Sequence, residues 1–553
     1  MIGVISKPDQ TATVEEFFQL FKTPWEIYRE DRFYEVVIAS SIDIPNVSAQ
    51  LLIIAGPEVK TLDSRYGITA SSVYPRATLN HHGLRLPLYS ETMTFEKASG
   101  NFVCSIEGDK VAGIKIHKAG MTVLRLGYDL FQEIEYLLGT GQPLEWAAVP
   151  TLESHIRLLR KWILDEGISF LEIPPSPAGH PFSVCLTHDI DFVGIKNHKF
   201  DHTMWGFLLR ATLGSLNRLV KGRISINQFL LSWRTALSLP LVYLGWAKDF
   251  WLPFEWYLDA EKGIESTYFL IPFKNRSGEN VDAKHAKRRA AAYDIMDITQ
   301  WTTALIREGC EIGVHGIDSW HSVEKGEREL RRILSVTGQA EAGVRMHWLT
   351  KDNNTYRILE KAGYAYDSSA GYNETIGYLC GTSQAFSPIG LKSLLELPMH
   401  VQDGALFYPR RLGLSEAEAW ERCRSLLQDA SEYGGALTFI WHDRSPQPER
   451  FWGGFYIKLI DHLKSLGVWF GTASQVVGWF RKRRIVTFAI PDTSAGAKKV
   501  TLSYKGEKIT PPLRVRIHRP CHVQEHSSAG EVENRSMVEV EWTGESNIEI
   551  ELA

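Results

Sequence analysis

Between residues 181 and 483 the sequence alternates short apolar runs with helical segments, and this pattern constrains the fold more than any other feature. Seven runs are typical of buried strands: SVCLTHD, STYFLIP, CEIGVHG, AGVRMHW, LLELPMH, ALTFIWH and VWFG. Between the fifth and sixth, the capping box Ser415-x-x-Glu418 and the pair Gly434 and Gly435 mark the two ends of a helix. Strands that alternate with helices favour parallel pairing, so we predict a distorted (β/α)7-type barrel over residues 181–483.

Polar residues occur at or just after the ends of these apolar runs. They are His188, Asp189, Asp191, His315, Arg345, His400 and His442. In barrels of parallel strands, the chemistry takes place at the carboxyl ends of the strands. We therefore place the candidate site at that edge of the predicted barrel.

The two ends of the chain follow different patterns. Residues 1–180 alternate strand-like and helical runs and include a predicted helix over 151–167, which indicates an N-terminal α/β domain with a linker. Residues 484–553 alternate strand-like runs with turn residues, which indicates a small C-terminal β domain. The tail contains His518, His522 and His526, which we interpret as surface histidines rather than metal ligands.

Composition excludes several classes of protein. The 553 residues are 44% hydrophobic, enough for a large core, and 61 basic against 65 acidic residues give a formal net charge of -4. No overall basic surface is available to neutralise a phosphate backbone, so nucleic acid is not an expected partner. The six cysteines form no C-x-x-C pair, and the start MIGVISKPDQTATVEEF lacks the pattern of a secretory signal. We therefore predict a cytoplasmic protein.

Residues 203–258 are rich in Trp, Leu and Phe with interspersed Arg and Lys. No run of about 18 uncharged apolar residues occurs, so we expect no membrane-spanning helix. The composition fits two alternatives, a helical insertion buried on its own domain or an amphipathic element at a membrane surface. We expect the buried insertion and keep a peripheral membrane contact as the alternative.

Asp189 and Asp191 form an Asp-x-Asp pair at the end of the first barrel strand. If one carboxylate binds a divalent cation, the other can accept a proton from water bound to that cation. A turn or a helix cap is the structural alternative.

EIGVHGIDSWH supplies the imidazoles of His315 and His321, six residues apart. Only a bend between them would aim both at one ion, because six residues span about 9 Å along a helix and about 20 Å along a strand. With Asp191, the pair would make a set of two imidazoles and one carboxylate, the arrangement of a hydrolytic zinc site.

Three further strand ends carry residues suited to supporting roles. The guanidinium of Arg345 can hold a carboxylate bidentately, although an ordinary salt bridge is an alternative. His442 is suited to act as the general acid for a leaving amine. His400 and Asp403 could orient His442, line the pocket or be structural.

Taken in chain order, these motifs resemble the polysaccharide deacetylase superfamily (NodB homology, carbohydrate esterase family 4), in its D-x-D branch. The resemblance covers roughly residues 181–483, interrupted by a helical insertion near 195–255. It implies that Asp189 is the catalytic base and that Asp191 and His315 are metal ligands. It also implies that Arg345 in VRMHW holds the base and that His442 in FIWH is the acid.

The sequence departs from the family pattern at two places. The usual histidine pair is four residues apart, a spacing that here falls on Ser319. His321 must then reach the metal through a longer loop, or Asp318 or water must replace it. The usual aromatic-proline text after the arginine is replaced by residues 346–348, Met-His-Trp, so we expect a different pocket wall.

The resemblance implies a metal-dependent hydrolase that removes the acetyl group from an N-acetylated sugar, with Zn²⁺ as the expected ion. The expected partner is a carbohydrate or acetamido-sugar substrate, which Trp320, Trp348 and Trp441 could stack against. Two alternatives remain open. One is an amidohydrolase acting on a small cyclic imide or ureide, and the other is a metal-free glycan-binding protein.

Overall fold

The computed structural model describes residues 1–118, 120–279, 281–490, 499–520 and 536–552. The chain forms two compact units, which we describe separately. The first comprises Met1–Gly179, Leu379–Gly390 and Trp479–Ala553, and the second comprises His180–Tyr378 and Leu391–Gly478. The division into domains at residues 180 and 483 stays a prediction.

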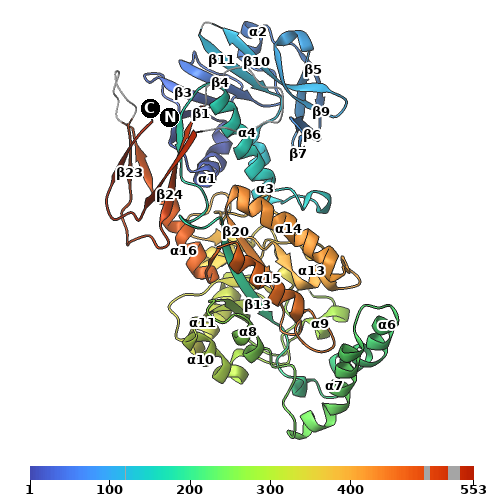
Figure 1. Ribbon diagram of the computed structural model, residues 1–553. Coiled ribbons are helices and arrows are strands. Elements are labelled where there is room, and N and C mark those ends of the chain that lie inside the picture. The colour runs from blue at the N-terminus through green and yellow to red at the C-terminus, as the bar shows by residue number, and fades with distance from the viewer. Residues whose placement is uncertain (119, 280, 491–498, 521–535, 553) are drawn as a thin grey trace. The chain divides into compact units, whose positions relative to one another are not determined.

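The first unit is built on a mixed sheet of nine strands (Figure 1). The strand order is β2-β1-β3-β4-β11-β10-β9-β6-β7, parallel from β2 to β11 and antiparallel from there to β7. The strands are β1 (Ile2–Ile5), β2 (Trp25–Ile27), β3 (Tyr34–Ala39), β4 (Ala49–Ala55), β6 (Ala77–His81), β7 (Leu84–Leu88), β9 (Asn101–Ile106), β10 (Lys110–Lys118) and β11 (Met121–Leu126).

Helices and three small sheets complete this unit. The helices are α1 (Thr11–Phe21), α2 (Thr61–Tyr66), α3 (Leu130–Gly139) and α4 (Thr151–Asp165). The small sheets are antiparallel: β5 (Ala70–Tyr74) with β8 (Thr92–Phe95), β12 (Phe170–Glu172) with β24 (Leu513–Arg519) and β25 (Ser536–Trp542), and β22 (Thr487–Ala489) with β23 (Lys499–Ser503) and β26 (Ile548–Glu551). The predicted helix over 151–167 is confirmed as α4.

One interpretation of the tail is wrong. His518 is not a surface residue, because β24 pairs with β12 and places the ring of His518 against Glu172, with Nε2 3.1 Å from Oε2. His522 and His526 lie outside the described residues.

The second unit is built on a sheet in which every pairing is parallel. The order is β18-β17-β16-β15-β14-β13-β20-β19, with β21 also beside β13. The strands are β13 (Ser183–Ile190), β14 (Thr267–Leu270), β15 (Glu311–Gly316), β16 (Val344–Met346), β17 (Tyr366–Asp367), β18 (Leu395–Glu396), β19 (Val401–Gln402), β20 (Ala436–Ile440) and β21 (Trp469–Phe470).

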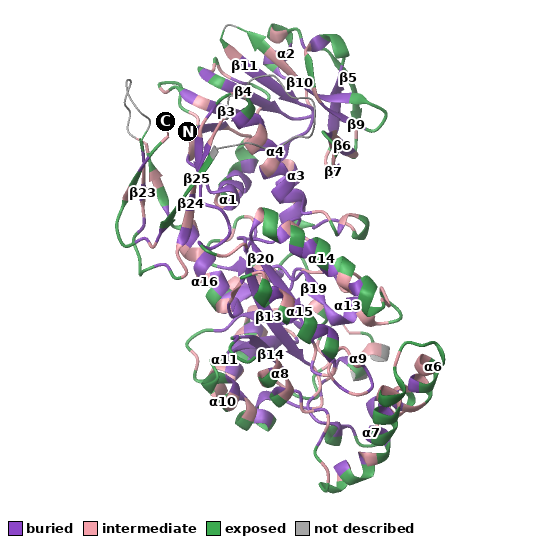
Figure 2. Cartoon of the chain, viewed as in Figure 1, coloured by how far each residue is buried: buried purple, intermediate pink, exposed green. Residues whose placement is uncertain are grey.

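Each of the seven predicted strands is present in this sheet. The structure adds β17 and β19, which are two residues long and therefore too short to show a hydrophobic pattern. All residues of β13, β14, β15 and β20 are buried, as Figure 2 shows for the strands at the centre of the unit. Burial on both faces is the reason that these strands are apolar without strict alternation.

Helices surround the parallel sheet. They are α8 (Phe254–Ala260), α9 (Ala283–Arg289), α10 (Thr299–Arg307), α11 (Val323–Thr337), α12 (Thr355–Ala362), α13 (Asp403–Phe407), α14 (Glu416–Tyr433), α15 (Gly453–Ser465) and α16 (Ala473–Arg484), the last of which contains the unit boundary at Trp479. The predicted capping box is confirmed at α14, where Ser415 N–H donates to Glu418 Oε2 at 2.8 Å and Glu418 N–H donates to Ser415 Oγ at 3.3 Å.

A helical hairpin is inserted after β13. It consists of α5 (His202–Leu209), a π-helical turn η5 (Arg210–Gly214), α6 (Ser215–Val220) and α7 (Ile226–Leu244). The expectation of a buried insertion is wrong for most of its large apolar side chains, because only a small cluster around Phe207, Leu239 and Trp251 is buried. Among the described residues, no helix combines the length and apolarity that crossing a membrane requires.

Candidate metal centre and active site

The Asp-x-Asp pair lies at the carboxyl end of β13. Side chains alternate across a strand, so Asp189 and Asp191 project to one face and His188 to the other. His188 lies against the helix α8 side of the sheet, where its Nε2 is 2.8 Å from Glu261 Oε1. The spacing of two residues is therefore the reason that both carboxylates reach the same space.

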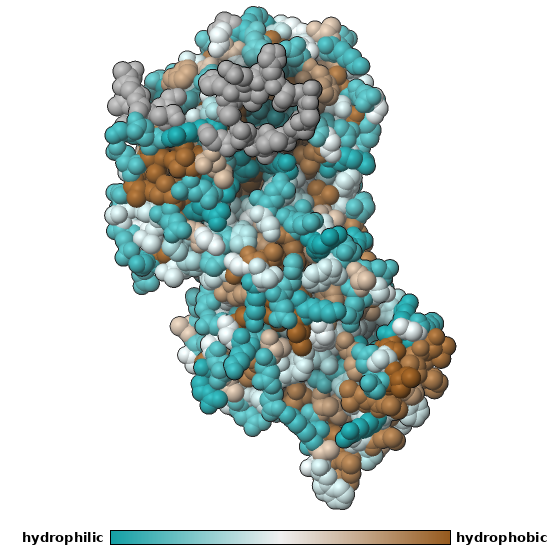
Figure 3. All heavy atoms as spheres, in the orientation of Figure 1, coloured by the Kyte–Doolittle hydropathy of each residue, from teal (hydrophilic) through white to brown (hydrophobic). Residues whose placement is uncertain are grey.

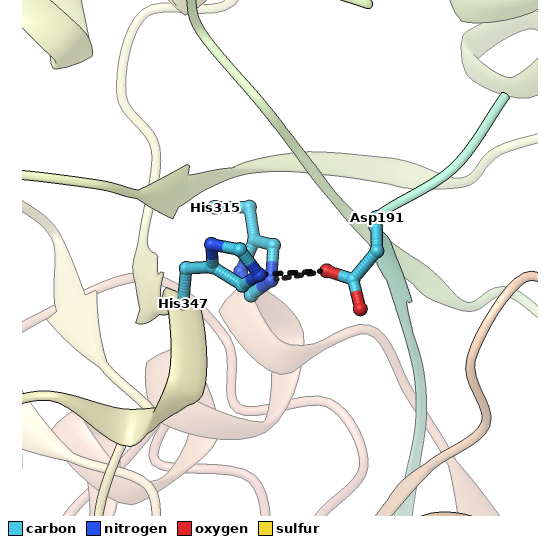
Figure 4. A group of neighbouring side chains, drawn as sticks. All are labelled: Asp191, His315 and His347. Carbon is cyan, nitrogen blue, oxygen red and sulfur yellow. Dashed lines mark hydrogen bonds and ion pairs between the residues drawn. The ribbon is translucent and has the colours of Figure 1, made fainter. Parts of the chain in front are cut away.

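Asp191, His315 and His347 form a candidate metal centre (Figure 4). Each offers one ligand atom, and these atoms all lie within 4.8 Å of one another. Asp191 Oδ1 is 3.2 Å from His315 Nε2 and 3.3 Å from His347 Nε2. Two ligand atoms of a tetrahedral zinc ion are about 3.3 Å apart, given bonds of about 2.0–2.1 Å. The donor types and both distances therefore fit a zinc ion.

The structure does not bring His321, the predicted third ligand, to Asp191 and His315. His321 is exposed, and its ring stands edge-on to Trp320. The substitute Asp318 also lies outside the group, because its Oδ1 accepts the N–H of Glu279 at 2.7 Å. The chain turns away after β15, so neither side chain reaches Asp191.

His347 enters the centre from the neighbouring strand. It directly follows β16, beyond which the chain bends sharply through Trp348 and Leu349, with φ of 63° and 54°. Non-glycine residues rarely adopt this left-handed conformation, and such strain is often found at functional sites. Arg289 stabilises the turn by donating from Nη2 to His347 O at 3.2 Å. The sequence signal for this ligand was its position two residues after Arg345, because side chains two residues apart along a strand project to the same face.

The hydrogen bonding of His315 is consistent with a cation in the centre. Its Nδ1 is 2.9 Å from the backbone oxygen of Arg345, and a carbonyl can only accept, so Nδ1 carries the proton. In the neutral ring, Nε2 then presents a lone pair to Asp191 Oδ1. Two acceptors that face each other at 3.2 Å require either a second proton on the ring or a metal ion between them.

The electrostatics of the centre couple its three members. Burial opposes ionisation of Asp191, but the imidazoles of His347 and His315 hold its pKa well below the usual value. Burial also acts to lower the pKa of His315, but Asp189 and Asp191 raise it above the ordinary value on balance. For His347, burial dominates and the pKa is lowered. The centre therefore offers an ionised carboxylate and at least one neutral imidazole.

Arg345 contacts the other carboxylate of the pair. From β16, its Nη1 donates to Asp189 Oδ1 at 3.2 Å and to Thr187 Oγ1 at 3.1 Å. The expected bidentate contact is absent, because Nε and Nη2 donate to Ser368 instead. Two strands separate β13 from β16, about 14 Å in a flat sheet, so this contact requires a curled sheet. The guanidinium is fully buried and orients Asp189.

His442 lies two residues beyond β20 and pairs with Asp403 at the start of α13. Its Nδ1 is 2.5 Å from Asp403 Oδ1, and its backbone N–H donates to Asp403 Oδ2 at 2.8 Å. Ser445 Oγ also donates to that oxygen. Burial acts to lower the pKa of His442, but the charge and hydrogen bond of Asp403, together with the charges of Asp191 and Asp189, raise it to about 10. The ring is therefore protonated at neutral pH and oriented by a buried carboxylate.

These side chains line one cavity of about 240 Å³. Asp189, Asp191, His315, His347 and His442 contribute to its wall, together with Asp443 and the exposed Trp348. The wall also includes five arginines: Arg288, Arg289, Arg411, Arg444 and Arg450. Within the described part of the chain, none of the five forms an ion pair with a carboxylate. Sequence reasoning missed this set because its members come from three separate segments: the end of α9, the loop after α13 and the loop after β20.

Other predicted residues lie outside the cavity. His400 accepts the N–H of Thr438 at its Nδ1, at 3.3 Å, and packs beside Tyr378. Trp441 is fully buried and stacks on Phe455, and Trp320 belongs to the same core cluster. Of the three tryptophans considered as ring platforms, only Trp348 faces the cavity.

Comparison with known proteins yields distant structural matches. No protein-family profile matches the chain, and no curated protein sequence matches it. A polysaccharide deacetylase structure from Mycobacterium smegmatis superposes at 18% identity with a TM-score of 0.35, covering 58% of this chain and all of that one. The carbohydrate deacetylase Agd3 superposes at 10% identity with a TM-score of 0.34, covering 100% of this chain and 98% of that one.

A mutant of a CE4 family pseudoenzyme superposes at 11% identity with a TM-score of 0.25, covering 55% of this chain and 70% of that one. Glycoside hydrolases of families GH42 and GH57 also match. At these identities and TM-scores, the superpositions establish neither a family nor an activity for this chain.

Proposed function

We propose that the protein is a metal-dependent hydrolase that removes the acetyl group from an N-acetylated sugar. One observation carries the proposal: the Asp191, His315 and His347 centre shares a single cavity with the Asp189–Arg345 and His442–Asp403 pairs. Metal-dependent hydrolysis of an amide uses a Lewis acid, a base and an acid at one place, and these three groups are suited to supply them.

Asp191, His315 and His347 would hold the ion, which we expect to be Zn²⁺. When bound, such an ion polarises a carbonyl and lowers the pKa of water to about 7. Asp189 lies on the same face of β13 as Asp191, two residues away, and is placed to accept the proton of the attacking water. Arg345 keeps Asp189 oriented through its hydrogen bond.

His442 is the proposed general acid. An amine leaves only if its nitrogen is protonated, because an amide anion is a very poor leaving group. The raised pKa of His442 keeps a proton on the ring, and Nδ1 is engaged by Asp403, so Nε2 is the nitrogen available to donate that proton.

The arginines of the cavity favour a negatively charged substrate. Five guanidinium groups without carboxylate partners at one wall leave an excess of positive charge. Arginine binds phosphate and carboxylate through its planar fork of donors. We therefore infer that the acetamido sugar carries an anionic group such as a phosphate.

The same proposal extends to the family and the fold. We infer that the parallel sheet is the distorted (β/α)7-type barrel of the D-x-D branch of polysaccharide deacetylases, with the C-terminal strands as a separate β domain. The order of the motifs and the shared cavity support this inference.

An acetate-release assay on the purified protein tests the proposal. The substrates are an N-acetylated sugar phosphate and its neutral parent, and bound metal is quantified by elemental analysis. We expect Asp189→Asn to lose activity by about 100-fold or more while it retains metal, because it removes the base. We expect Asp191→Asn to lose the metal itself.

Three outcomes would contradict parts of the proposal. Equal metal loss in Asp189→Asn and Asp191→Asn would refute the separate roles of base and ligand. Absence of bound metal in the wild-type protein would favour the metal-free binding protein. Hydrolysis of a cyclic imide but not of either sugar would favour the other amidohydrolase.

A further inference from the structure

The hairpin of α5, α6 and α7 exposes an unusual amount of apolar surface. In Figure 3, hydrophobic side chains gather over α6 and α7. Large apolar side chains that are more than half exposed include Trp205 (59%), Leu213 (62%), Val220 (79%), Leu237 (74%) and Trp246 (77%). A contiguous exposed apolar patch of this kind marks a surface that contacts a membrane or another protein.

Helix α7 has a buried stripe and an exposed apolar stripe on opposite sides. The inner stripe is Ser232, Thr235, Ala236, Leu239 and Val242, all buried, and the last three belong to the apolar cluster of the hairpin. The outer stripe is Ile226, Leu230, Trp233, Leu237, Leu241 and Leu244, all exposed. Steps of three and four residues place the outer six on one narrow face. A water-facing helix would carry polar residues there, so this face is built for contact with something else.

The charge of the hairpin identifies what that contact is. Without counting histidine, residues 195–248 contain eight basic residues and one acidic residue, Asp201, although the whole chain carries a net charge of -4. Lys196, Lys199, Lys221 and Arg223 are exposed, and in the described part of the chain none of them pairs with a carboxylate. An apolar face bordered by cations matches an anionic lipid surface.

The hairpin is anchored beside the cavity. Asp249 accepts the N–H groups of Ile195 and Trp251 at 2.9 Å and 3.0 Å, and thereby joins the two ends of the insertion. The insertion starts at Ile195, four residues after Asp191. Ser232 Oγ on α7 donates to Pro448 O at 2.9 Å, in the loop that carries the cavity residue Arg450.

We propose that the hairpin of residues 202–246 docks the protein on an anionic membrane surface, with the outer stripe of α7 and the exposed apolar residues of α5 and α6 in the interface. A second copy of the chain fits this face less well, because pairing two such hairpins would bring like charges together. If the proposed function holds, the cavity would meet an anionic sugar carried on a lipid. The docking itself does not depend on that function.

Vesicle co-sedimentation of the full-length protein tests the proposal. The probes are vesicles of phosphatidylcholine alone and of phosphatidylcholine mixed with phosphatidylglycerol. We expect binding to the mixed vesicles that weakens as salt is added, and little binding to the neutral ones. Neutralising Lys221 and Arg223 with glutamine should weaken binding by about 25-fold, since each cation near an anionic surface contributes roughly fivefold.

Apolar variants separate insertion from simple charge attraction. Leu230→Gln with Leu237→Gln should weaken binding by about tenfold or more for each leucine. Both side chains are exposed, so the melting temperature should not change. The matched control is Ile457→Gln, which alters a 42% exposed side chain on α15 and should leave vesicle binding intact.

Two results would overturn the proposal. The first is no binding to the mixed vesicles, or binding that the leucine variants leave unchanged. The second is a dimer in light scattering that Leu230→Gln with Leu237→Gln dissociates, without vesicle binding by the wild type, because that result assigns the face to a second copy of the chain. Because neither assay measures hydrolysis, failure of the deacetylase proposal would not affect the outcome.

Discussion

Replacing Asp403 with asparagine should lower the pKa of His442 and remove the acid at neutral pH. Asp403 is fully buried and contacts the His442 ring at 2.5 Å. At an effective dielectric constant of about 20, unit charges about 4 Å apart interact by about 4 kcal/mol. That energy corresponds to about 3 pKa units. The variant ring should therefore titrate near pH 7 or below, compared with about 10 for the metal-free wild type.

The raised pKa of His442 sets the pH above which activity should be lost. Because the pKa of His442 is raised, the protonated ring is present below about pH 10 and is lost as the pH rises through that value. A bound metal would offset the charges of Asp191 and Asp189. In the metal-loaded enzyme, the pH at which His442 loses its proton should therefore lie below about 10 in both the wild type and Asp403→Asn. The difference in the pKa of His442 between the wild type and Asp403→Asn should remain when the metal is bound.

The assay is the pH dependence of kcat/KM, which reports the acid in the free enzyme. We expect the alkaline limb to move down by about 3 units in Asp403→Asn and activity at about pH 8 to fall at least tenfold. The matched control is Ser445→Ala, which removes a hydroxyl donor to Asp403 but keeps its charge, and should move the limb by less than about one unit. An unmoved limb in Asp403→Asn would refute the role of this pair.

Three further predictions concern the metal and the stability of the first unit. His347→Ala should lose bound metal and His321→Ala should retain it, as elemental analysis would show; the reverse would contradict the geometry. A chelator should lower the melting temperature of the wild type but not of Asp191→Asn, because a ligand at about 1,000 times its Kd stabilises by about 4 kcal/mol. Glu172→Gln should lower the unfolding free energy by about 3 kcal/mol in urea, because Arg160 then loses its buried partner. Arg160 and His518 hold the pKa of Glu172 low, against the effect of burial. As the pH falls below about 4, Glu172 of the wild type becomes protonated and loses its ion pair with Arg160. The difference in unfolding free energy between the wild type and Glu172→Gln should therefore shrink.

The sequence alone determined the parts of the site that depend on local periodicity. Seven apolar runs predicted the strands of the parallel sheet, and the spacing of Asp189 and Asp191 predicted that both carboxylates share one face. The sequence also predicted that Arg345 and His442 lie at the site, because both follow apolar runs and parallel strands bring their carboxyl ends to one edge of the sheet. Asp403 was one of two candidates for orienting His442, and the structure selects it over His400.

Only the tertiary structure decided the contacts that depend on how loops turn after the strands end. His347 rather than His321 joins Asp191, because the chain bends at Trp348 while the loop after β15 leads away. The periodicity of the sequence could not predict that the hairpin is exposed. The outer apolar stripe of α7 has the same sequence pattern whether another segment covers it or not. Spacing along the chain specifies which face a side chain takes, and packing between distant segments specifies what that face meets.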